Sequence, residues 1–303
     1  MLQSRHRLSR LGQTSATYRQ PRQNTITERR SPSRPQFLPG WRKTIPGGAE
    51  NRPAAIGPKA GSSVSVWTSQ VATLLAASNA LNLLTDDDRI SLQAYRSPEQ
   101  RDTATAARIL LRLSLSLMVT RRRAPNEWRF ERTRFGKPFV RDDNEAIDFS
   151  VSHADQVVMV AIGRNVKLGV DVESVDQPIE DKVVDDFCHD TETQALQSLP
   201  QPRRARSFIQ LWTQKEAYTK MLGVGHFIDF DSFSLEKIQE NGDPTSRHIV
   251  EEFYFSLKQS LYHASLVINP QRPSSPIDVQ LMTAVAPGRA ACALSPPPLT
   301  NLS

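Results

Sequence analysis

Cysteine and long apolar runs are the two features that this sequence of 303 residues most clearly lacks. Its two cysteines, Cys188 and Cys292, do not have the spacing of metal ligands, and so few thiols are typical of a reducing compartment. No stretch approaches the roughly eighteen apolar residues of a membrane-spanning helix, and the N-terminus lacks the apolar core of a secretory signal. We therefore expect a cytoplasmic protein that does not span a membrane.

Acidic residues are scarce in the first sixty positions. Residues 1–60 contain 12 Lys/Arg but only 2 Asp/Glu, whereas the remainder contains 26 basic and 30 acidic residues. Few large apolar residues occur there, so residues 1–61 are expected to be a disordered basic extension. A nucleic-acid-binding arm and a mitochondrial transit peptide are the functional alternatives to an extension without a structural role. Five prolines between positions 21 and 46 oppose an amphipathic targeting helix.

From residue 62 onward, apolar periodicity and capping signals predict an α+β fold. Helices are expected near 85–95, 98–113, 178–199 and 202–222, the last ending at Gly223. Strands are expected near 64–67, 157–162, 166–173, 233–238, 248–257, 262–268 and 279–285, with a strand pair over 130–140 broken at Gly136. The strands at 157–162 and 166–173 are expected to pair as a hairpin. Two similar halves follow, 62–168 and 169–290, before a loose tail at 291–303.

Three carboxylates and one ammonium carry the chemistry of the second half. On a strand over 166–173, Asp171 and Glu173 project to the same side. In the helix over 202–222, Trp212, Glu216 and Lys220 are four residues apart and share one face. Magnesium prefers oxygen ligands and often completes its shell with phosphates and water. Each motif alone is typical of a solvated strand face or a surface ion pair, but together they indicate a magnesium site beside phosphates.

Five motifs follow one another in a fixed order over residues 64–285. They are FGKP at 135–138, FSVSH at 149–153, GVDVE at 169–173, WTQKEAYTK at 212–220 and GVG at 223–225. This series resembles the Sfp-type 4′-phosphopantetheinyl transferases, whose pattern runs G-K-P, F-N-x-S-H-S, G-[IV]-D-[IV]-E, W-x-x-K-E-[AS]-[YF]-x-K and G-x-G. The resemblance implies two similar α/β halves that form a pseudodimer within one monomeric chain, with the active site in the cleft between them.

The activity that the resemblance implies is transfer of the 4′-phosphopantetheine arm of coenzyme A. The acceptor would be a serine of an apo acyl, peptidyl or aryl carrier protein domain, and 3′,5′-ADP would be released with Mg²⁺ as cofactor. Asp171, Glu173 and Glu216 would bind the metal. Glu216 would also serve as base for the carrier serine, directly or through water, and Lys220 would contact the pyrophosphate and stabilise the leaving group.

The resemblance also implies how coenzyme A is held. Ser152 and His153 would bind its 3′-phosphate, and Lys137 would lie near the same phosphate or the adenine. Further positive charge is expected from the first half. Because Asp88 and Ser91 stand near positions where some relatives carry lysines, the candidates there are Arg89, Arg96 and Arg101.

Two neighbours of these residues have plainer expected roles. Lys215 lies on another helix face than Glu216 and is expected to form a structural ion pair. Trp212 is expected to pack in the core. Around the SH pair, Ser150 and Ala154 stand where the family has Asn and Ser.

Two functions from other classes compete with transfer. A nucleic-acid-associated protein would use the basic arm, but the body has a net negative charge and shows no basic face with interleaved aromatics, so nucleic acid is not expected as a partner. A catalytically inactive relative would serve as a binding module, but the intact Asp171, Glu216 and Lys220 oppose that reading. The carrier and its pathway stay open among fatty acid, polyketide, peptide synthetase and aminoadipate reductase systems.

Overall fold

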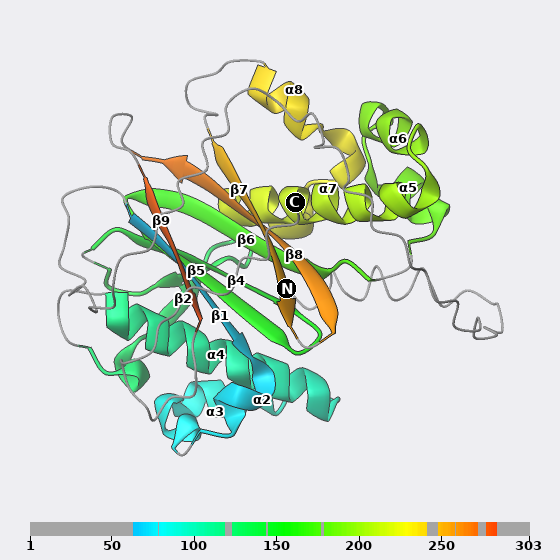
Figure 1. Cartoon of the computed structure of the whole chain (residues 1–303). Helices are drawn as coiled ribbons and strands as arrows, with labels where there is room; N and C mark the ends of the chain where they lie inside the picture. The colour runs from blue at the N-terminus through cyan, green and yellow to red at the C-terminus, as the bar shows by residue number, and fades with distance from the viewer. Residues whose placement is uncertain are drawn as a thin grey trace, which may run out of the picture.

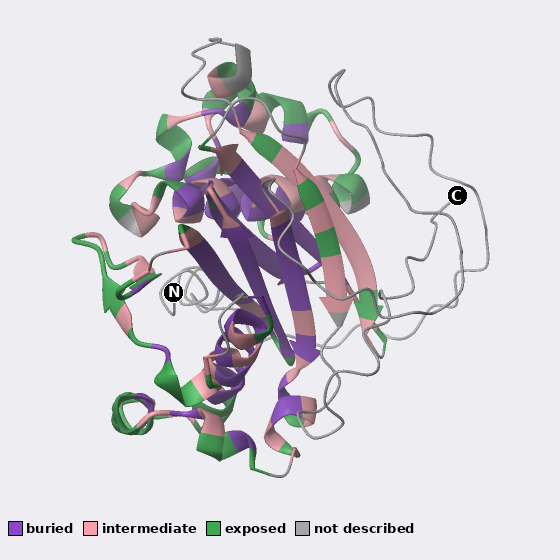
Figure 2. Ribbon diagram, turned by 90° about the vertical axis from the view of Figure 1, so that its left-hand side faces the viewer, coloured by how far each residue is buried: buried purple, intermediate pink, exposed green. Residues whose placement is uncertain are grey.

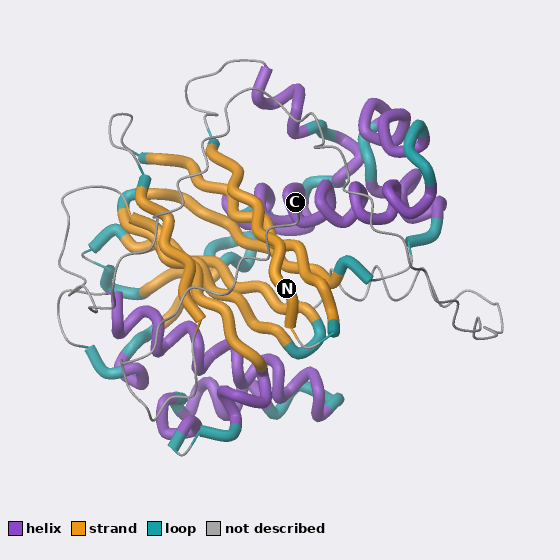
Figure 3. Tube along the Cα trace, in the orientation of Figure 1, coloured by secondary structure: helices purple, strands orange, loops and turns teal. Residues whose placement is uncertain are grey.

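The computed structural model describes residues 63–77, 79–118, 123–143, 145–176, 179–240, 248–257, 259–271 and 277–283. Over these residues the chain forms layers, with helices on both outer sides of the strands (Figures 1 and 3). The mixed α+β character is confirmed. The expected extension at 1–61 and the expected tail at 291–303 lie outside the described residues. No helix in the described ranges combines the length and the apolar character needed to cross a bilayer.

The first sheet has four strands in the order β4-β5-β1-β9, where β1 is antiparallel to β5 and parallel to β9. Its strands are β1 (Ser63–Gln70), β4 (Ile147–Ala154), β5 (Val157–Arg164) and β9 (Asp278–Thr283). The helices α2 (Val71–Leu75), α3 (Asp86–Leu92) and α4 (Pro98–Met118) lie together on one side, at the bottom of Figure 1. The expected strand pair is confirmed as β2 (Phe130–Arg132) and β3 (Pro138–Val140).

The second sheet is antiparallel, in the order β6-β8-β7. Its strands are β6 (Val166–Ser174), β7 (Ile249–Leu257) and β8 (Ser260–Pro270), and the helices of this half are α5 (Asp181–Phe187), α6 (Asp190–Gln197), α7 (Gln201–Leu222) and α8 (Leu235–Glu240). The short 3₁₀ helices are η1 (Ala80–Leu83), η2 (Pro125–Glu127), η3 (Gly225–Phe227) and η4 (Phe230–Ser232).

Side-chain alternation along the strands builds the core on two sides of the first sheet. Trp67 and Phe149 belong to one apolar cluster with Leu110 of α4. Val66 of the first sheet and Leu168 of the second belong to another cluster, which lies between the two sheets. Because neighbouring residues of a strand face opposite sides, one strand serves both clusters. Buried residues are accordingly concentrated in the central strands (Figure 2).

Local signals correctly predicted the start of α3 and the end of α7. Thr85 caps α3 in a capping box with Asp88, and Gly223, with φ +74°, ends α7 in the left-handed conformation that favours glycine. The helix expected over 178–199 is instead two short helices, α5 and α6, because the backbone is extended at Cys188 and His189.

Two sequence predictions about strands are wrong. The strands β5 and β6 do not form a hairpin, because β5 already pairs with β4 and β1 while β6 pairs with β8. The chain passes from one sheet to the other through Asn165 (φ +53°). The segment 233–238 is not a strand and contributes to α8 instead. A short run of alternating apolar residues such as this one does not distinguish a strand from a helix.

The two halves share one order of elements. In the first, β1, α4 and the β4–β5 hairpin give the strand order β4-β5-β1, and in the second, β6, α7 and the β7–β8 hairpin give β7-β8-β6. The expected division after residue 168 falls inside β6, which starts at Val166, and β9 pairs with β1 of the first sheet.

Candidate active site

Helix α7 lies directly on β6 because of Gly169. A Cβ atom at this position would lie 1.9 Å from the carbonyl oxygen of Ala217 and 2.4 Å from the amide nitrogen of Met221, both backbone atoms of α7. A backbone cannot move aside as a flexible side chain can, so the close approach requires glycine. This contact sets the height of Glu216 and Lys220 above the strand that carries Asp171.

Side chains of β4 satisfy the free edge of β6, where the two sheets meet. Asp148, Ser150 and Ser152 alternate along β4 and so face the same side. Their oxygens accept hydrogen bonds from alternate amides of β6: Leu168 N at 2.8 Å, Val170 N at 3.1 Å and Val172 N at 3.4 Å. Sequence reasoning did not predict that side chains of β4 join the two sheets at this seam. The spacing of the three polar residues in an otherwise apolar strand was a signal of it.

The centre of the site is an ammonium held against Asp171. Lys220 Nζ donates to Asp171 Oδ1 at 2.7 Å, to Ser152 Oγ at 3.2 Å and to the carbonyl oxygen of Val170 at 3.2 Å. The Ser152 hydroxyl donates to the same Asp171 oxygen at 2.7 Å. Asp171 and Ser152 are buried, so these contacts are shielded from water.

Two more carboxylates act on this ammonium. Burial by itself would lower the pKa of Lys220, but the attraction of Asp171, then of Glu216, and a weaker attraction of Glu173 outweigh it and raise the pKa. Glu173 and Glu216 are buried, as Asp171 is. All three carboxylates therefore favour the charged form of Lys220, and the lysine stays cationic at neutral pH.

The donor set fits a hard divalent cation. Asp171 Oδ2 is buried and has no hydrogen-bond partner in the described part of the chain, and the neighbouring Glu173 and Glu216 also offer carboxylate oxygens. Over the same residues, no three His, Cys, Asp or Glu side chains are already arranged around a single metal position. An unpartnered buried oxygen is costly, and a cation between the carboxylates would satisfy it.

The neighbours Lys215 and Trp212 have the structural roles expected of them. Lys215 is almost fully buried, forms an ion pair with Glu192, and donates to the carbonyl oxygens of Phe230 at 2.6 Å and Phe233 at 2.8 Å. Burial lowers the pKa of Lys215, and its hydrogen bond to Glu192 offsets part of the effect. Trp212 packs in an aromatic cluster whose rings belong to Phe187, Phe208 and Phe230.

His153 and Ser152 are adjacent on β4 and therefore project to opposite faces of the strand. Ser152 faces Asp171, whereas His153 shares its face with Phe149 and Val151, which pack with the α4 layer. The phosphate contacts predicted for Ser152 and His153 stay predictions. In this structure the Ser152 hydroxyl is held by Asp171 and Lys220.

The three candidate arginines lie on the helical layer of the first half, and all are exposed. Arg89 donates to the carbonyl oxygen of Leu81 and Arg101 to that of Tyr95, each at 2.8 Å. Among the described residues, Arg89, Arg96 and Arg101 form no ion pair with Asp171, Glu173 or Glu216, so their part in binding also stays a prediction.

The orientation of α4 bears on these arginines. Arg164, at the end of β5, donates to the carbonyl oxygen of Met118 at 2.7 Å, which places the C-terminal end of α4 there. Since α4 packs along β5, its N-terminal end, which carries Arg101, is directed toward the end of the sheet that carries His153.

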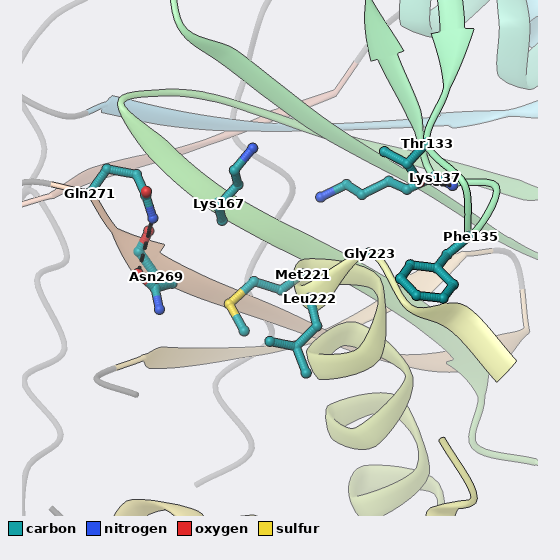
Figure 4. A pocket seen from close by; sticks show the side chains of 9 residues that line it. All are labelled: Thr133, Phe135, Lys137, Lys167, Met221, Leu222, Gly223, Asn269 and Gln271. Atoms are coloured by element: carbon teal, nitrogen blue, oxygen red, sulfur yellow. Dashed lines mark hydrogen bonds between the residues drawn. The ribbon is translucent and has the colours of Figure 1, made fainter. Parts of the chain in front are cut away.

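Lys137 lines a hollow of about 280 Å³ at the C-terminal end of α7 (Figure 4). Its Nζ donates to Asp148 Oδ2 at 2.8 Å and to the carbonyl oxygen of Leu168 at 3.0 Å. Burial lowers the pKa of Lys137, and Asp148 offsets part of the effect. Phe135 and Lys167 also line the hollow, but the three carboxylates do not. Whether Lys137 contacts phosphate or adenine stays a prediction.

The described site is a group of buried acidic residues around Lys220, where the two sheets meet. Comparison with known proteins identifies the class of protein to which such a site belongs. A family model described as 4′-phosphopantetheinyl transferase, N-terminal, matches residues 65–164, and one described as 4′-phosphopantetheinyl transferase superfamily matches residues 167–269. The two matches meet where the chain crosses from β5 to β6. The chain belongs to the 4′-phosphopantetheinyl transferase superfamily.

Individual relatives agree with the family models. The chain is 40% identical over 110 residues to 4′-phosphopantetheinyl transferase gsp of Aneurinibacillus migulanus, which is 36% of this chain and 44% of the relative. It is 33% identical over 118 residues to 4′-phosphopantetheinyl transferase psf-1 of Bacillus pumilus, 39% and 49% of the two chains. It is 29% identical over 146 residues to 4′-phosphopantetheinyl transferase HetI of a Nostoc species, 47% and 60%. The chain thus spans about half the length of these curated relatives.

Proposed function

We propose that this protein transfers the 4′-phosphopantetheine arm of coenzyme A to a serine of an apo carrier protein domain. The observation that carries the proposal is the position of Lys220, whose ammonium lies against Asp171 within the field of Glu173 and Glu216. An ammonium and three carboxylates can together hold a pyrophosphate, a divalent cation and a departing phosphate. Family membership and the names of the relatives support the same activity.

The two halves are proposed to form a pseudodimer with the active site between them. The shared strand orders, β4-β5-β1 and β7-β8-β6, support this arrangement. The site combines Ser152 from β4 of the first half with Asp171, Glu216 and Lys220 of the second. A substrate bound at the seam would therefore contact both halves.

Asp171, Glu173 and Glu216 are the proposed ligands of Mg²⁺. When bound, Mg²⁺ would supply Lewis-acid neutralisation of charge on the pyrophosphate. The unpartnered Asp171 Oδ2 supports its role as a direct ligand. Glu173 extends from the same strand face two residues further along.

Glu216 and Lys220 divide the chemical work. Glu216 accepts the hydroxyl proton of the carrier serine, directly or through a water molecule, as the serine oxygen forms a bond to the phosphorus next to pantetheine. The bond from that phosphorus to the bridging oxygen breaks, and 3′,5′-ADP leaves with the electron pair. Lys220 places a positive charge against this departing phosphate. One turn of α7 separates the two residues, so base and cation act from one rigid element.

The 3′-phosphate of coenzyme A is proposed to bind on the other face of β4. His153 lies there, and α4 directs Arg101 toward the same end of the sheet. Arg89 and Arg96 belong to the same helical layer and are secondary candidates. Ser152 and Lys137 would reach a phosphate only after rearranging their present contacts with Asp171 and Asp148. Carrier domains of the acyl, peptidyl or aryl type, a monomeric state and a cytoplasmic location complete the proposal. No observation favours the nucleic-acid or inactive-module alternatives.

The direct test is incubation with coenzyme A, Mg²⁺ and a panel of apo carrier proteins, read by intact mass. One phosphopantetheine should be added to at least one carrier, and removal of Mg²⁺ with a chelator should abolish the addition. Absence of modification across fatty acid, polyketide, peptide synthetase and aminoadipate reductase carriers would contradict the proposal.

A comparison of two donors tests the assignments within the site. His153→Ala should weaken use of coenzyme A by about ten- to hundredfold more than use of dephospho-coenzyme A, because a charge-assisted contact is lost only with the first donor. Lys220→Ala should impair both donors alike, since each contains the pyrophosphate. Equal losses for both donors in His153→Ala would remove the histidine from the 3′-phosphate site.

A further inference from the structure

A second polar network lies under α7, on the same face of the sheet as the carboxylates. His263 Nδ1 lies 2.8 Å from Thr213 Oγ1, and Thr213 Oγ1 lies 2.9 Å from Ser265 Oγ. On the other side of the ring, His263 Nε2 lies 3.1 Å from Glu252 Oε1, and Gln214 Nε2 donates to that same oxygen at 2.8 Å. Thr213, His263 and Ser265 have no exposed surface.

Strand register places this network beside the carboxylates. In the antiparallel pair of β6 and β8, Ser265 stands opposite Asp171 and His263 stands opposite Glu173. Residues that face each other across such a pair project to the same side of the sheet. Thr213 lies three residues before Glu216 on α7, close to one turn of the helix. The network therefore links the strand beside two carboxylates to the helix that carries the third.

Hydrogen-bond chemistry fixes part of the arrangement. A carboxylate only accepts, so His263 Nε2 carries a hydrogen and donates it to Glu252. The Thr213 hydroxyl has His263, Ser265 and the carbonyl oxygen of Gln210, at 2.9 Å, within reach. Moving α7 along the sheet would leave several fully buried polar groups without partners, which is costly in a low-dielectric interior.

The order Thr213, His263 and Glu252 is also that of a hydrolytic triad, but burial excludes such a reaction. Neither the hydroxyl nor the imidazole reaches solvent, so no substrate carbonyl can approach them. The chemistry available to the network is to hold neighbouring groups in place.

We propose that Thr213 and His263 are positioning residues, which fix Glu216 opposite Asp171 and Glu173 by locking α7 to β8. This inference rests on the proposed function, because Glu216 is there both a metal ligand and the base. Buried partners that orient metal ligands typically change metal affinity or activity by about ten- to hundredfold when removed.

The test replaces the hydroxyl of Thr213 and uses a matched control on the same helix. Thr213→Val keeps the shape and removes every contact of the hydroxyl, whereas Thr213→Ser restores it. Thr219→Val is the control, since Thr219 is also buried, also lies three residues from Glu216, and donates to the carbonyl oxygen of Glu216 in its own helix. Each variant is measured for affinity for Mn²⁺ alone, for kcat and coenzyme A KM at saturating Mg²⁺, and for thermal unfolding.

Thr213→Val should lower Mn²⁺ affinity and kcat by about tenfold or more, with KM for coenzyme A unchanged. Thr213→Ser and Thr219→Val should remain near the wild type in both, and Ser265→Ala should follow Thr213→Val with a smaller loss. If Thr213→Val and Thr219→Val differ only in melting temperature, the network is structural and the inference is overturned.

The same measurements separate this inference from the proposed function. A wild type that binds Mn²⁺ but modifies no carrier would contradict the transfer reaction, while a selective loss of Mn²⁺ affinity in Thr213→Val would still support positioning. A wild type that binds no Mn²⁺ would overturn both.

Discussion

The two longest helices, α4 and α7, occupy equivalent places in the two halves but bury very different side chains. Helix α4 presents mainly apolar residues to Trp67 and Phe149 of the first sheet, and its one buried cation, Arg112, pairs with Asp88. Helix α7 buries Thr213, Lys215 and Glu216, and its next turn carries Lys220. The same order of elements thus holds a mainly apolar helix in the first half and a helix with buried polar and charged residues in the second. The two helices differ in the side chains that they bury against their sheets.

The largest effect is expected where the second half departs most from the first, at Asp171. Asp171→Ala and Glu216→Ala should each lower the rate of transfer by about a hundredfold or more, because each removes a proposed metal ligand. Glu173→Gln should be milder. Rates measured at saturating Mg²⁺ check this, with Asp86→Ala, an exposed position on α3, as the control. A normal rate in either alanine variant would dismiss the site.

The second half also differs from the first in backbone packing, because α7 approaches β6 closely at Gly169. Gly169→Ala should destabilise the fold by about 1–3 kcal/mol or more and should also reduce activity, since the new methyl group would displace α7. Gly163→Ala is the control on β5. The three atoms nearest its Cβ would be side-chain atoms of the buried Val166, Leu168 and Val64, so this variant should also lose stability. Since none of these atoms belongs to α7, it should keep its activity. Urea unfolding and kcat are the measurements. A Gly169→Ala protein with full activity would show that α7 tolerates displacement.

The buried cation of the first half, Arg112, is expected to contribute to stability and not to activity. Arg112 Nη2 lies 2.6 Å from Asp88 Oδ2 and Arg112 Nη1 lies 2.9 Å from the carbonyl oxygen of Trp128. Arg112→Met leaves a buried carboxylate poorly paired and should cost about 3–5 kcal/mol of unfolding free energy. Activity per folded molecule should persist, because this pair lies in the α4 layer. A fall in kcat without a fall in stability would assign Arg112 to the reaction instead.

The smallest effect concerns the pH dependence of two lysines. The pKa of Lys220 is raised in the folded protein, so its charge stabilises the fold below the unfolded value of about 10.5, and this contribution is lost as pH rises through the folded pKa. The pKa of Lys137 is lowered, so its titration makes the fold more stable as pH rises toward 10.5. Urea unfolding is measured between pH 8 and pH 11 in the presence of a metal chelator. The slope of the unfolding free energy against pH should change in opposite directions in Lys220→Met and Lys137→Met. Parallel changes would reject the assigned environments.

Much of the candidate site could be predicted because its members are close in sequence. Asp171 and Glu173 are two apart on a strand, and Glu216 and Lys220 are four apart on a helix, so local periodicity places each pair on one face. The same holds for the ends of α3 and α7, where Thr85 and Gly223 give local signals. The prediction that β5 and β6 form a hairpin was wrong, because strand pairing depends on which strand edges are free, and both edges of β5 are occupied by β4 and β1.

Sequence by itself determined the chemical groups of this protein and the family to which it belongs, because side-chain type and short-range spacing are written in the order of residues. Tertiary structure alone decided that the amides of β6 are satisfied by β4 side chains, that Lys220 lies against Asp171, and that His263 meets Thr213. The last two pairs are about fifty residues apart in sequence. Contacts of that range arise from sheet register and from the packing of α7 at Gly169, which no local pattern specifies.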